Sequence, residues 1–214
     1  MKLTALQYGT TRITERMAFP GGDPEKEIPI ALLFFLIETE NRRILVDTGC
    51  DTMPGFPLYA HEKPVRTLAR CGHAPGDITD VILTHAHGDH AGCAHYYPNA
   101  LFWIQEDALE PARKYLPEAP RLRLFKDRAQ PAEGITIRHM GGHARGSCIV
   151  ELGNTVLCGD ECYTRENLTL GIPTGSCRDA EKSAAFIRQY SSPNYRTILF
   201  HDPTLVGGIG VRVL

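Results

Sequence analysis

The sequence has no hydrophobic run long enough to cross a membrane. Its longest apolar run covers residues 30–37, whereas a membrane-spanning helix takes roughly 20 residues. Residues 1–8 contain no apolar stretch followed by a small-residue cleavage site, so no secretory signal is apparent. We therefore expect a cytoplasmic protein with no membrane partner, and we interpret residues 30–37 as a buried strand.

An excess of charge of one sign is also lacking. The 23 Lys and Arg residues nearly cancel the 25 Asp and Glu residues, and no block of like charge stands out. A nucleic-acid partner is not expected, because proteins that bind polyanions carry a concentrated positive surface. The 7 cysteines are an odd number, and without a secretory signal we interpret them as reduced thiols.

Two common catalytic or metal-binding patterns are missing. No Gly-x-Ser-x-Gly segment occurs, so the sequence gives no sign of a serine nucleophile on a sharp turn. Cys158 and Cys162 are not at Cys-x-x-Cys spacing, and no second pair at zinc-finger spacing exists. We interpret both as structural thiols, and Cys93 as an inert buried thiol.

Apolar and β-branched segments recur between Gly, Pro and Asp residues along the whole chain. The strand candidates are residues 30–38, 43–46, 81–83, 100–104, 135–139, 148–152, 155–157 and 197–200. The helix candidates are residues 64–70, 106–115 and 179–190. This mixture, without repeats or linkers, predicts one α/β domain over residues 1–214 whose sheets are covered by helices. Residues 48–63 and 116–131 are expected to be long connections, either of which could shape a substrate entrance.

A dense group of metal-ligand side chains follows the candidate strand at 81–83. Residues 84–90 read Thr-His-Ala-His-Gly-Asp-His. In an extended backbone His85 and His87 point the same way, so both can reach one ion, and Asp89 and His90 then turn toward a second. A lone histidine is more often an ordinary surface or core residue, but four ligands in this order indicate a metal site. Imidazole and carboxylate without thiolate suit zinc, and also admit iron, manganese, cobalt or nickel.

This group, the upstream segment Ile-Leu-Val-Asp-Thr-Gly at 44–49, and single ligands downstream resemble the metallo-β-lactamase superfamily. The downstream matches are His143 after Gly142, Asp160 after Gly159, and His201 before Asp202. The resemblance covers nearly the whole chain. It implies an αββα sandwich, in which two mixed sheets are flanked by helices.

The resemblance also implies a ligand set for two zinc ions per chain. In the family's pattern the first metal is held by His85, His87 and His143, the second by Asp89, His90 and His201, and Asp160 bridges both. Asp47 would be a supporting residue that orients a ligand, or else a turn residue in Asp-Thr-Gly. The remaining histidines, which lack such a context, are interpreted as ordinary ones: His61, His73, His95 and His139.

Within the superfamily, residues 160–167 resemble the corresponding segment of N-acyl-homoserine lactonases, which place a tyrosine three residues after the bridging aspartate. Tyr163 stands there, where its phenol could donate a hydrogen bond to a lactone carbonyl or to the tetrahedral oxyanion. A core tyrosine is the alternative. The resemblance thus predicts that a metal-activated hydroxide opens a small lactone or ester, with Asp89 and Tyr163 as catalytic residues. A homodimer is left open.

Two departures from the lactonase pattern leave the substrate open. Ala86 and Gly88 stand where the lactonases usually have bulky apolar residues, so we expect a different acyl pocket. The chain is also somewhat short for that family. The alternatives are a glyoxalase-II-like thioester hydrolase, which usually carries an added C-terminal helical region, and a mononuclear iron dioxygenase of the same fold.

Overall fold

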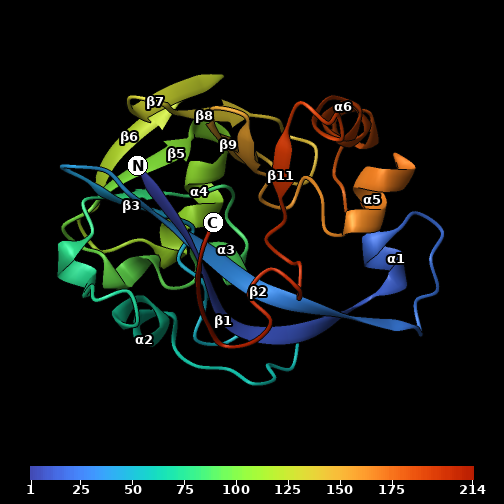
Figure 1. The fold of residues 1–214 in the computed structure, drawn as a ribbon, viewed down its shortest axis with the longest axis horizontal. Helices are drawn as coiled ribbons and strands as arrows, with labels where there is room; N and C mark the ends of the chain where they lie inside the picture. Colours follow the sequence, from blue (N-terminus) through green and yellow to red (C-terminus); the bar gives the residue numbers. More distant parts are fainter.

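Two β-sheets form the centre of the protein in the computed structural model, which describes residues 1–214 (Figure 1). The 7-stranded sheet has the order β12-β1-β2-β3-β4-β5-β6, and the 5-stranded sheet has the order β11-β10-β9-β8-β7. The strands of the first sheet are β1 (Lys2–Thr14), β2 (Glu27–Glu38), β3 (Arg43–Val46), β4 (Asp80–Ile82), β5 (Leu101–Gln105), β6 (Arg121–Phe125) and β12 (Gly210–Val213). Those of the second are β7 (Arg128–Ala132), β8 (Ile135–His139), β9 (Cys148–Leu152), β10 (Thr155–Leu157) and β11 (Arg196–Ile198).

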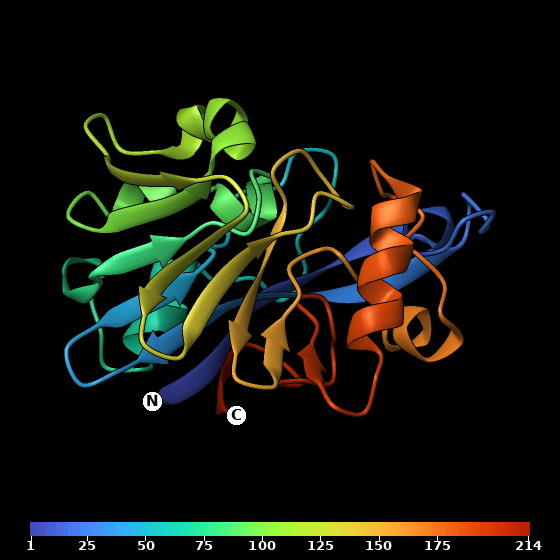
Figure 2. The ribbon, with the colours of Figure 1, turned by 90° about the horizontal axis from the view of Figure 1, so that it is seen from above.

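Short helices cover the outer faces of both sheets (Figure 2). The α-helices are α1 (Glu15–Ala18), α2 (Pro64–Ala69), α3 (Gly88–Ala91), α4 (Leu109–Ala112), α5 (Arg165–Leu170) and α6 (Ala180–Tyr190). The 3-10 turns are η1 (Pro75–Asp77), η2 (Ala94–Tyr96), η3 (Glu106–Ala108) and η4 (Arg113–Tyr115). The helix α6 begins after Asp179, whose side chain accepts a hydrogen bond from the Lys182 amide at 3.1 Å and so caps the helix. None of these helices is both long and apolar enough to span a membrane.

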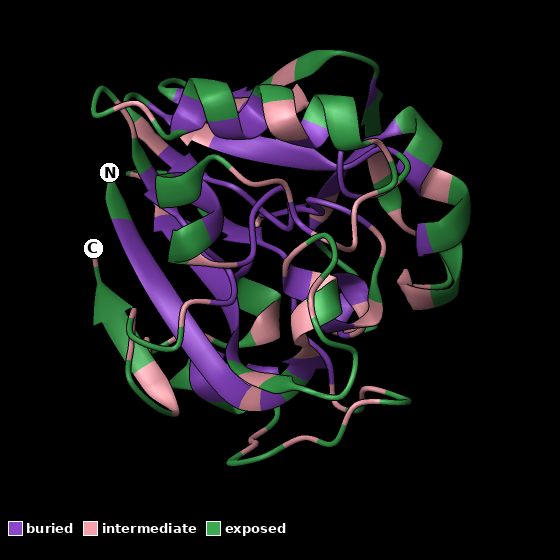
Figure 3. Ribbon diagram, turned by 90° about the vertical axis from the view of Figure 1, so that its right-hand side faces the viewer, coloured by how far each residue is buried: buried purple, intermediate pink, exposed green.

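The strand β2 shows how the layers form. Its residues alternate between two cores: Leu33, Phe35 and Ile37 pack between the sheets, whereas Leu32 and Phe34 pack on the outer face with α2 and α4. Since side chains of a strand alternate in direction, a continuous apolar run is the pattern of a strand buried on both faces. Most of the strand residues are buried, and the helices are exposed on their outer sides (Figure 3). The predicted αββα sandwich is therefore confirmed.

The topology gathers the ends of parallel strands at one edge of each sheet. The strands β3, β4 and β5 are parallel, and so are β10 and β11. Asp47 follows β3, His85 follows β4 closely, and Asp160 and His201 lie shortly after β10 and β11. Parallel strands end at the same edge of a sheet, so residues far apart in the chain come together there.

One predicted connection is wrong. Residues 116–131 contain the strands β6 and β7, which are edge strands of the two sheets. The sequence of β6, Arg-Leu-Arg-Leu-Phe, does alternate, but it is charged because the strand is largely exposed. Pro131 lies in β7 at a register irregularity, and an edge strand or bulge is where a sheet tolerates proline.

Two further differences concern the first strand and the fourth helix. The strand β1 was not predicted, although it pairs with both β2 and β12. The predicted helix at 106–115 is divided into η3, α4 and η4, and it contains Pro111, which cannot donate a backbone hydrogen bond. Residues 48–63 do form the predicted long connection, with only an isolated bridge between Thr10 and Tyr59.

Candidate metal centre

Asp47 and residues 84–90 lie together where β3 and β4 end. The Asp47 carboxylate accepts hydrogen bonds from the Thr84 amide and the Thr84 hydroxyl, both at 2.7 Å. These bonds fix the start of the segment against β3. The chain then turns into α3 at Gly88, which brings the ring of His90 within 4.1 Å of the His85 ring, measured between centroids.

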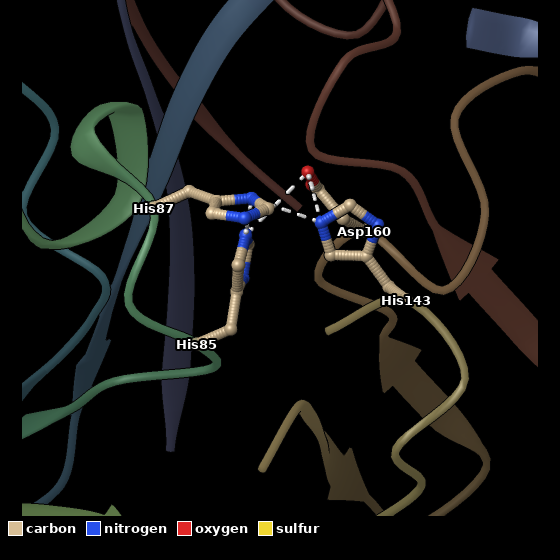
Figure 4. A group of neighbouring side chains, drawn as sticks. All are labelled: His85, His87, His143 and Asp160. Carbon is tan, nitrogen blue, oxygen red and sulfur yellow. Dashed lines mark hydrogen bonds and ion pairs between the residues drawn. The ribbon is translucent and has the colours of Figure 1, made fainter. Parts of the chain in front are cut away.

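A first group of four side chains converges at this edge (Figure 4). We call it the first group: His85, His87, His143 and Asp160. The His87 Nδ1 lies 3.1 Å from His85 Nε2 and 3.0 Å from His143 Nε2. The Asp160 Oδ2 lies 3.6 Å from His85 Nε2 and 3.4 Å from His143 Nε2. His87 is exposed, whereas the other three are buried.

A second group shares the same aspartate. The second group consists of Asp89, His90, His201 and Asp160, all buried. The Asp160 Oδ1 lies 3.0 Å from His90 Nε2 and 3.1 Å from His201 Nε2. The Asp89 Oδ2 lies 3.6 Å from His90 Nε2 and 3.8 Å from His201 Nε2. Thus one oxygen of Asp160 faces the first group and the other faces the second.

Four of the histidines are also held by the ring nitrogen that points away from the centre. The Nδ1 partners are Thr84 Oγ1 for His85 (3.1 Å), Asp47 Oδ2 for His90 (2.6 Å), the Ser176 carbonyl for His143 (3.0 Å) and the Ala31 carbonyl for His201 (2.8 Å). Each such contact fixes the ring and leaves Nε2 directed inward. All seven side chains predicted as ligands are thus brought together in two groups.

Asp47 is both a turn residue and a residue that orients a ligand, the two interpretations that its sequence context allows. Its φ of 63° is a left-handed conformation, which Asp and Asn adopt more readily than most residues. Its buried carboxylate also accepts the hydrogen bond from His90 Nδ1. Burial raises the pKa of Asp47, against the opposing effects of His90 and Thr84. Asp47 is therefore a turn residue that also orients a histidine of the second group.

The histidines of the two groups differ in basicity. Burial lowers the pKa of His85 well below its ordinary value and lowers that of His143 to about 4. These imidazoles are neutral near pH 7. Burial also opposes protonation of His90 and His201, but the negative charges of Asp160 and Asp89 outweigh it and raise both pKa values. Burial likewise opposes ionisation of Asp160, yet the surrounding histidines hold its pKa well below the usual range.

Tyr163 lies between the two groups. Its ring centroid is 5.7 Å from that of His143 and 5.4 Å from that of His201, and the residue lines the cavity beside them. Burial, together with the charges of Asp160 and Asp89, raises the pKa of Tyr163 well above its ordinary value. Its phenol therefore stays protonated and can donate a hydrogen bond.

Sequence reasoning missed Glu161, which directly follows Asp160 and is fully buried. Its Oε1 accepts hydrogen bonds from the Gly142 amide (3.2 Å), the His143 amide (3.3 Å) and the Ser147 hydroxyl (2.5 Å). Burial raises the pKa of Glu161 to about 7. These partners lie 14 to 19 positions away in the chain, so no local pattern reveals them.

A cavity of about 470 Å³ opens onto both groups. Its lining includes Met53, Pro54 and Phe56 of the long connection at 48–63, as a substrate entrance there would require. Part of the lining belongs to a small apolar cluster in which Ile13, Met17 and other side chains pack beside Tyr163. The cavity thus joins an apolar wall to the polar groups.

The residues interpreted as ordinary lie outside both groups. His61 contacts the Cys50 carbonyl at 3.2 Å, and His73 contacts Glu38 at 3.0 Å. Cys158 and Cys162 are free, fully buried thiols in the core beside α6, which confirms their structural interpretation. Cys93 is a free, buried thiol as well.

Curated proteins with similar sequences include lactonases. The N-acyl homoserine lactonase AiiB of Agrobacterium fabrum is 26% identical, over 94% of this chain and 93% of the relative. The N-acyl homoserine lactonase AiiA of Bacillus thuringiensis subsp. kurstaki is 28% identical, over 70% of this chain and 71% of the relative.

Solved structures share the fold. An N-acyl homoserine lactone hydrolase, with the product N-hexanoyl-L-homoserine at its catalytic metal center, has a TM-score of 0.84 and 22% identity, over 94% of this chain and 93% of the other. The dizinc quorum-quenching lactonase AidC has a TM-score of 0.74 and 17% identity, over 99% and 93% of the two chains.

The family model described as the metallo-beta-lactamase superfamily matches residues 33–200. That range runs from within β2 to the residue before His201. It includes the whole 5-stranded sheet, the 7-stranded sheet apart from β1, β12 and the start of β2, and all but one of the side chains in the two groups. The chain belongs to the metallo-beta-lactamase superfamily.

Proposed function

We propose that this protein is a hydrolase that binds two zinc ions per chain and opens the ester bond of a lactone of the N-acyl-homoserine type. The position of Asp160 carries the proposal. Its Oδ2 faces two histidines of the first group and its Oδ1 faces two histidines of the second, at 3.0 to 3.6 Å. A carboxylate so placed can bridge two cations.

One observation that does not depend on family membership supports zinc binding by these side chains. His90 Nε2 and Asp160 Oδ1 are buried and lie 3.0 Å apart, yet neither forms a well-directed hydrogen bond. Unpartnered buried polar atoms are costly in a folded protein, so this arrangement favours a cation between them. The donors are imidazole and carboxylate, which suit zinc.

The assignment of residues follows from the two groups. His85, His87 and His143 would hold one ion, Asp89, His90 and His201 the other, and Asp160 both. Zinc ions bound there would lower the pKa of a shared water from about 15.7 toward 7 and polarise the ester carbonyl.

Two side chains act on the substrate itself. Tyr163 is protonated and lines the cavity, so its hydroxyl can donate to the carbonyl oxygen as negative charge develops there. Asp89 lines the same cavity, where the carboxylate oxygen that does not hold the ion can accept the proton of the attacking water and return it to the leaving alcohol.

The substrate class is supported by the relatives and by the cavity. The curated relatives are named N-acyl homoserine lactonases, and one solved structure holds the ring-opened product N-hexanoyl-L-homoserine. The cavity of about 470 Å³, with its apolar wall, falls within the usual range for small-molecule sites, about 300 to 1,000 Å³. It can enclose an acyl chain next to a polar lactone.

A substrate panel with metal analysis tests the proposal. Zinc-loaded protein is assayed against N-acyl-homoserine lactones, simple lactones and thioesters, with zinc per chain measured on the same samples. We expect close to two zinc ions per chain, fastest turnover of an acyl-homoserine lactone, and loss of turnover with a chelator. One iron per chain after zinc-replete expression, or fastest turnover of a thioester, would contradict it.

A further inference from the structure

One part of the cavity lining is neither apolar nor part of the two groups. Lys114 and Tyr115, at the end of η4, both line the cavity. Lys114 is the one Lys or Arg side chain of that lining. Tyr115 packs against the outer core of the first sheet, away from the apolar cluster beside Tyr163. The cavity therefore has a polar part that the proposed reaction does not use.

Gly88 lies beside the Tyr115 hydroxyl. A Cβ atom at Gly88 would lie 3.4 Å from the Tyr115 hydroxyl oxygen, an ordinary van der Waals contact, and nothing else would lie within 4 Å of it. Since Gly88 lies between His87 and Asp89, the hydroxyl is held close to the segment that contributes to both groups.

Lys114 is left without a carboxylate partner. The neighbouring cations are paired, Arg113 with Glu110 at 2.7 Å and Arg145 with Asp107 at 3.3 Å. The Lys114 ammonium instead lies 4.7 Å from the centroid of the Tyr115 ring. A cation over an aromatic face is weakly attracted to it, which keeps the ammonium beside the phenol while its hydrogen-bond donors stay free.

We propose that Lys114 and Tyr115 form a second binding subsite at the cavity, which accepts an anionic group, a carboxylate, carried by the substrate apart from its ester bond. This inference rests on the proposed function for the identity of the ester. An ammonium and a phenol can both donate hydrogen bonds to a carboxylate.

The charge of the site favours the same class of substrate. Of the residues lining the cavity, Asp89 and Asp160 are the carboxylates, and two zinc ions would exceed their charge. Lys114 adds one more positive charge. An anionic substrate would therefore be attracted to this cavity more strongly than a neutral one of the same size.

A pair of substrates tests the subsite. Two acyl-homoserine lactones of equal chain length are compared, one ending in a methyl group and one in a carboxylate. The kcat and KM values of zinc-loaded parent protein are measured for both. We expect kcat/KM to favour the carboxylate by roughly 3-fold to 10-fold, as one partly exposed charge-assisted contact allows. Lys114→Met should bring that ratio close to one, and Tyr115→Phe should lower it partly.

Arg113→Met is the matched control. It removes the same charge from the adjacent position, but Arg113 is paired with Glu110 and does not line the cavity. The ratio should therefore stay at the parent value in this variant. Three outcomes would overturn the subsite. The parent protein could show equal kcat/KM for the two substrates, Lys114→Met could keep the parent preference for the carboxylate, or Arg113→Met could lose that preference as fully as Lys114→Met.

Calorimetric binding of the two ring-opened products separates this proposal from the proposed function. If neither lactone is hydrolysed by protein with two zinc ions, the proposed function fails. Tighter binding of the product with the additional carboxylate, lost in Lys114→Met but not in Arg113→Met, would still support the subsite. Equal binding of both products by the parent would overturn it.

Discussion

The two groups share Asp160 but are supported in different ways. The second group is buried throughout, and Asp47 contacts the His90 ring directly at 2.6 Å. In the first group His87 is exposed, and Glu161 holds His143 through backbone amides. Each group thus has one buried carboxylate behind it. One orients a side chain, whereas the other orients the loop that carries a side chain.

This difference predicts how selectively a substitution can weaken zinc binding by one group and not by the other. Loss of a direct contact to a ring changes which nitrogen carries the proton, whereas loss of a backbone contact changes only the position of the loop. We therefore expect zinc binding by the second group to weaken more, when its supporting carboxylate is replaced, than zinc binding by the first group. The substitutions below range from one that affects both groups to one that affects the first group alone.

Asp160→Asn should have the largest effect, because Asp160 belongs to both groups. A neutral amide is a poorer bridge between two cations than a carboxylate. We expect loss of zinc, most strongly from the second group, and a fall in turnover of more than about 100-fold, beyond the usual range for residues behind the ligands. Zinc per chain and kcat are measured together. The control is Asp202→Asn, whose carboxylate pairs with Arg165. Parent values in Asp160→Asn would count against the assignment.

Asp47→Asn should weaken the second group alone. Asn tolerates the left-handed backbone at this position, so the fold should be kept. The amide would face His90 Nδ1 with a donor in place of an acceptor, and this favours the tautomer whose Nε2 carries the proton. We expect zinc affinity at one of two sites to fall about 10-fold to 100-fold. Titration against a chelating dye measures both sites, and equal weakening of the two would contradict the separate support of the groups.

Tyr163→Phe should change neither group, because Tyr163 is a member of neither and phenylalanine keeps the ring that lies beside His143 and His201. Losing one oxyanion donor costs on the order of 100-fold to 1,000-fold elsewhere, but neighbouring cations would share the charge here. We expect kcat to fall roughly 10-fold to 100-fold with zinc content unchanged. The control is Tyr195→Phe, because Tyr195 is partly buried against the apolar cluster beside α6 and does not line the cavity. Equal turnover in Tyr163→Phe and the parent would return Tyr163 to a core role.

Glu161→Ala should weaken the first group by the smallest amount, about 10-fold in zinc affinity, at the lower end for supporting residues. The substitution removes the acceptor for the Gly142 and His143 amides. Glu161→Gln keeps an oxygen at that place and should restore most of the affinity. If both variants lose zinc equally, or if the loss is at the second group, Glu161 does not act through the loop of His143.

The ligand set could be predicted from the sequence because residues 84–90 hold four ligands in a dense motif, and because the resemblance to the metallo-β-lactamase superfamily supplied the other three, His143, Asp160 and His201. Asp160 and His201 follow the strands β10 and β11, which pair in parallel, and His85 follows β4, which lies between its parallel neighbours β3 and β5 in the other sheet. Glu161 and Lys114 could not be predicted in this way, although Asp47 and Tyr163 were. Glu161 acts on partners 14 to 19 positions away. Lys114 lines the cavity from η4, one of the 3-10 turns into which the predicted helix is divided.

The fold was predicted where apolar runs are continuous, and it was missed where strands are exposed or where, as in the buried strand β1, polar residues interrupt the apolar ones. The strand β2 is apolar on both faces and was recognised, whereas β6 and β7 lie at sheet edges and carry charged or proline residues there. Edge strands are expected to look this way, because charge and proline protect an open edge from pairing with another chain.

The bridging role of Asp160 is tested most directly by anomalous diffraction at the zinc edge, on crystals of zinc-loaded protein. The account predicts two peaks roughly 3.5 to 4 Å apart, the first among His85, His87 and His143 and the second among Asp89, His90 and His201. Asp160 Oδ2 should coordinate the first ion and Oδ1 the second. A single peak, or both oxygens of Asp160 on one ion, would contradict the account.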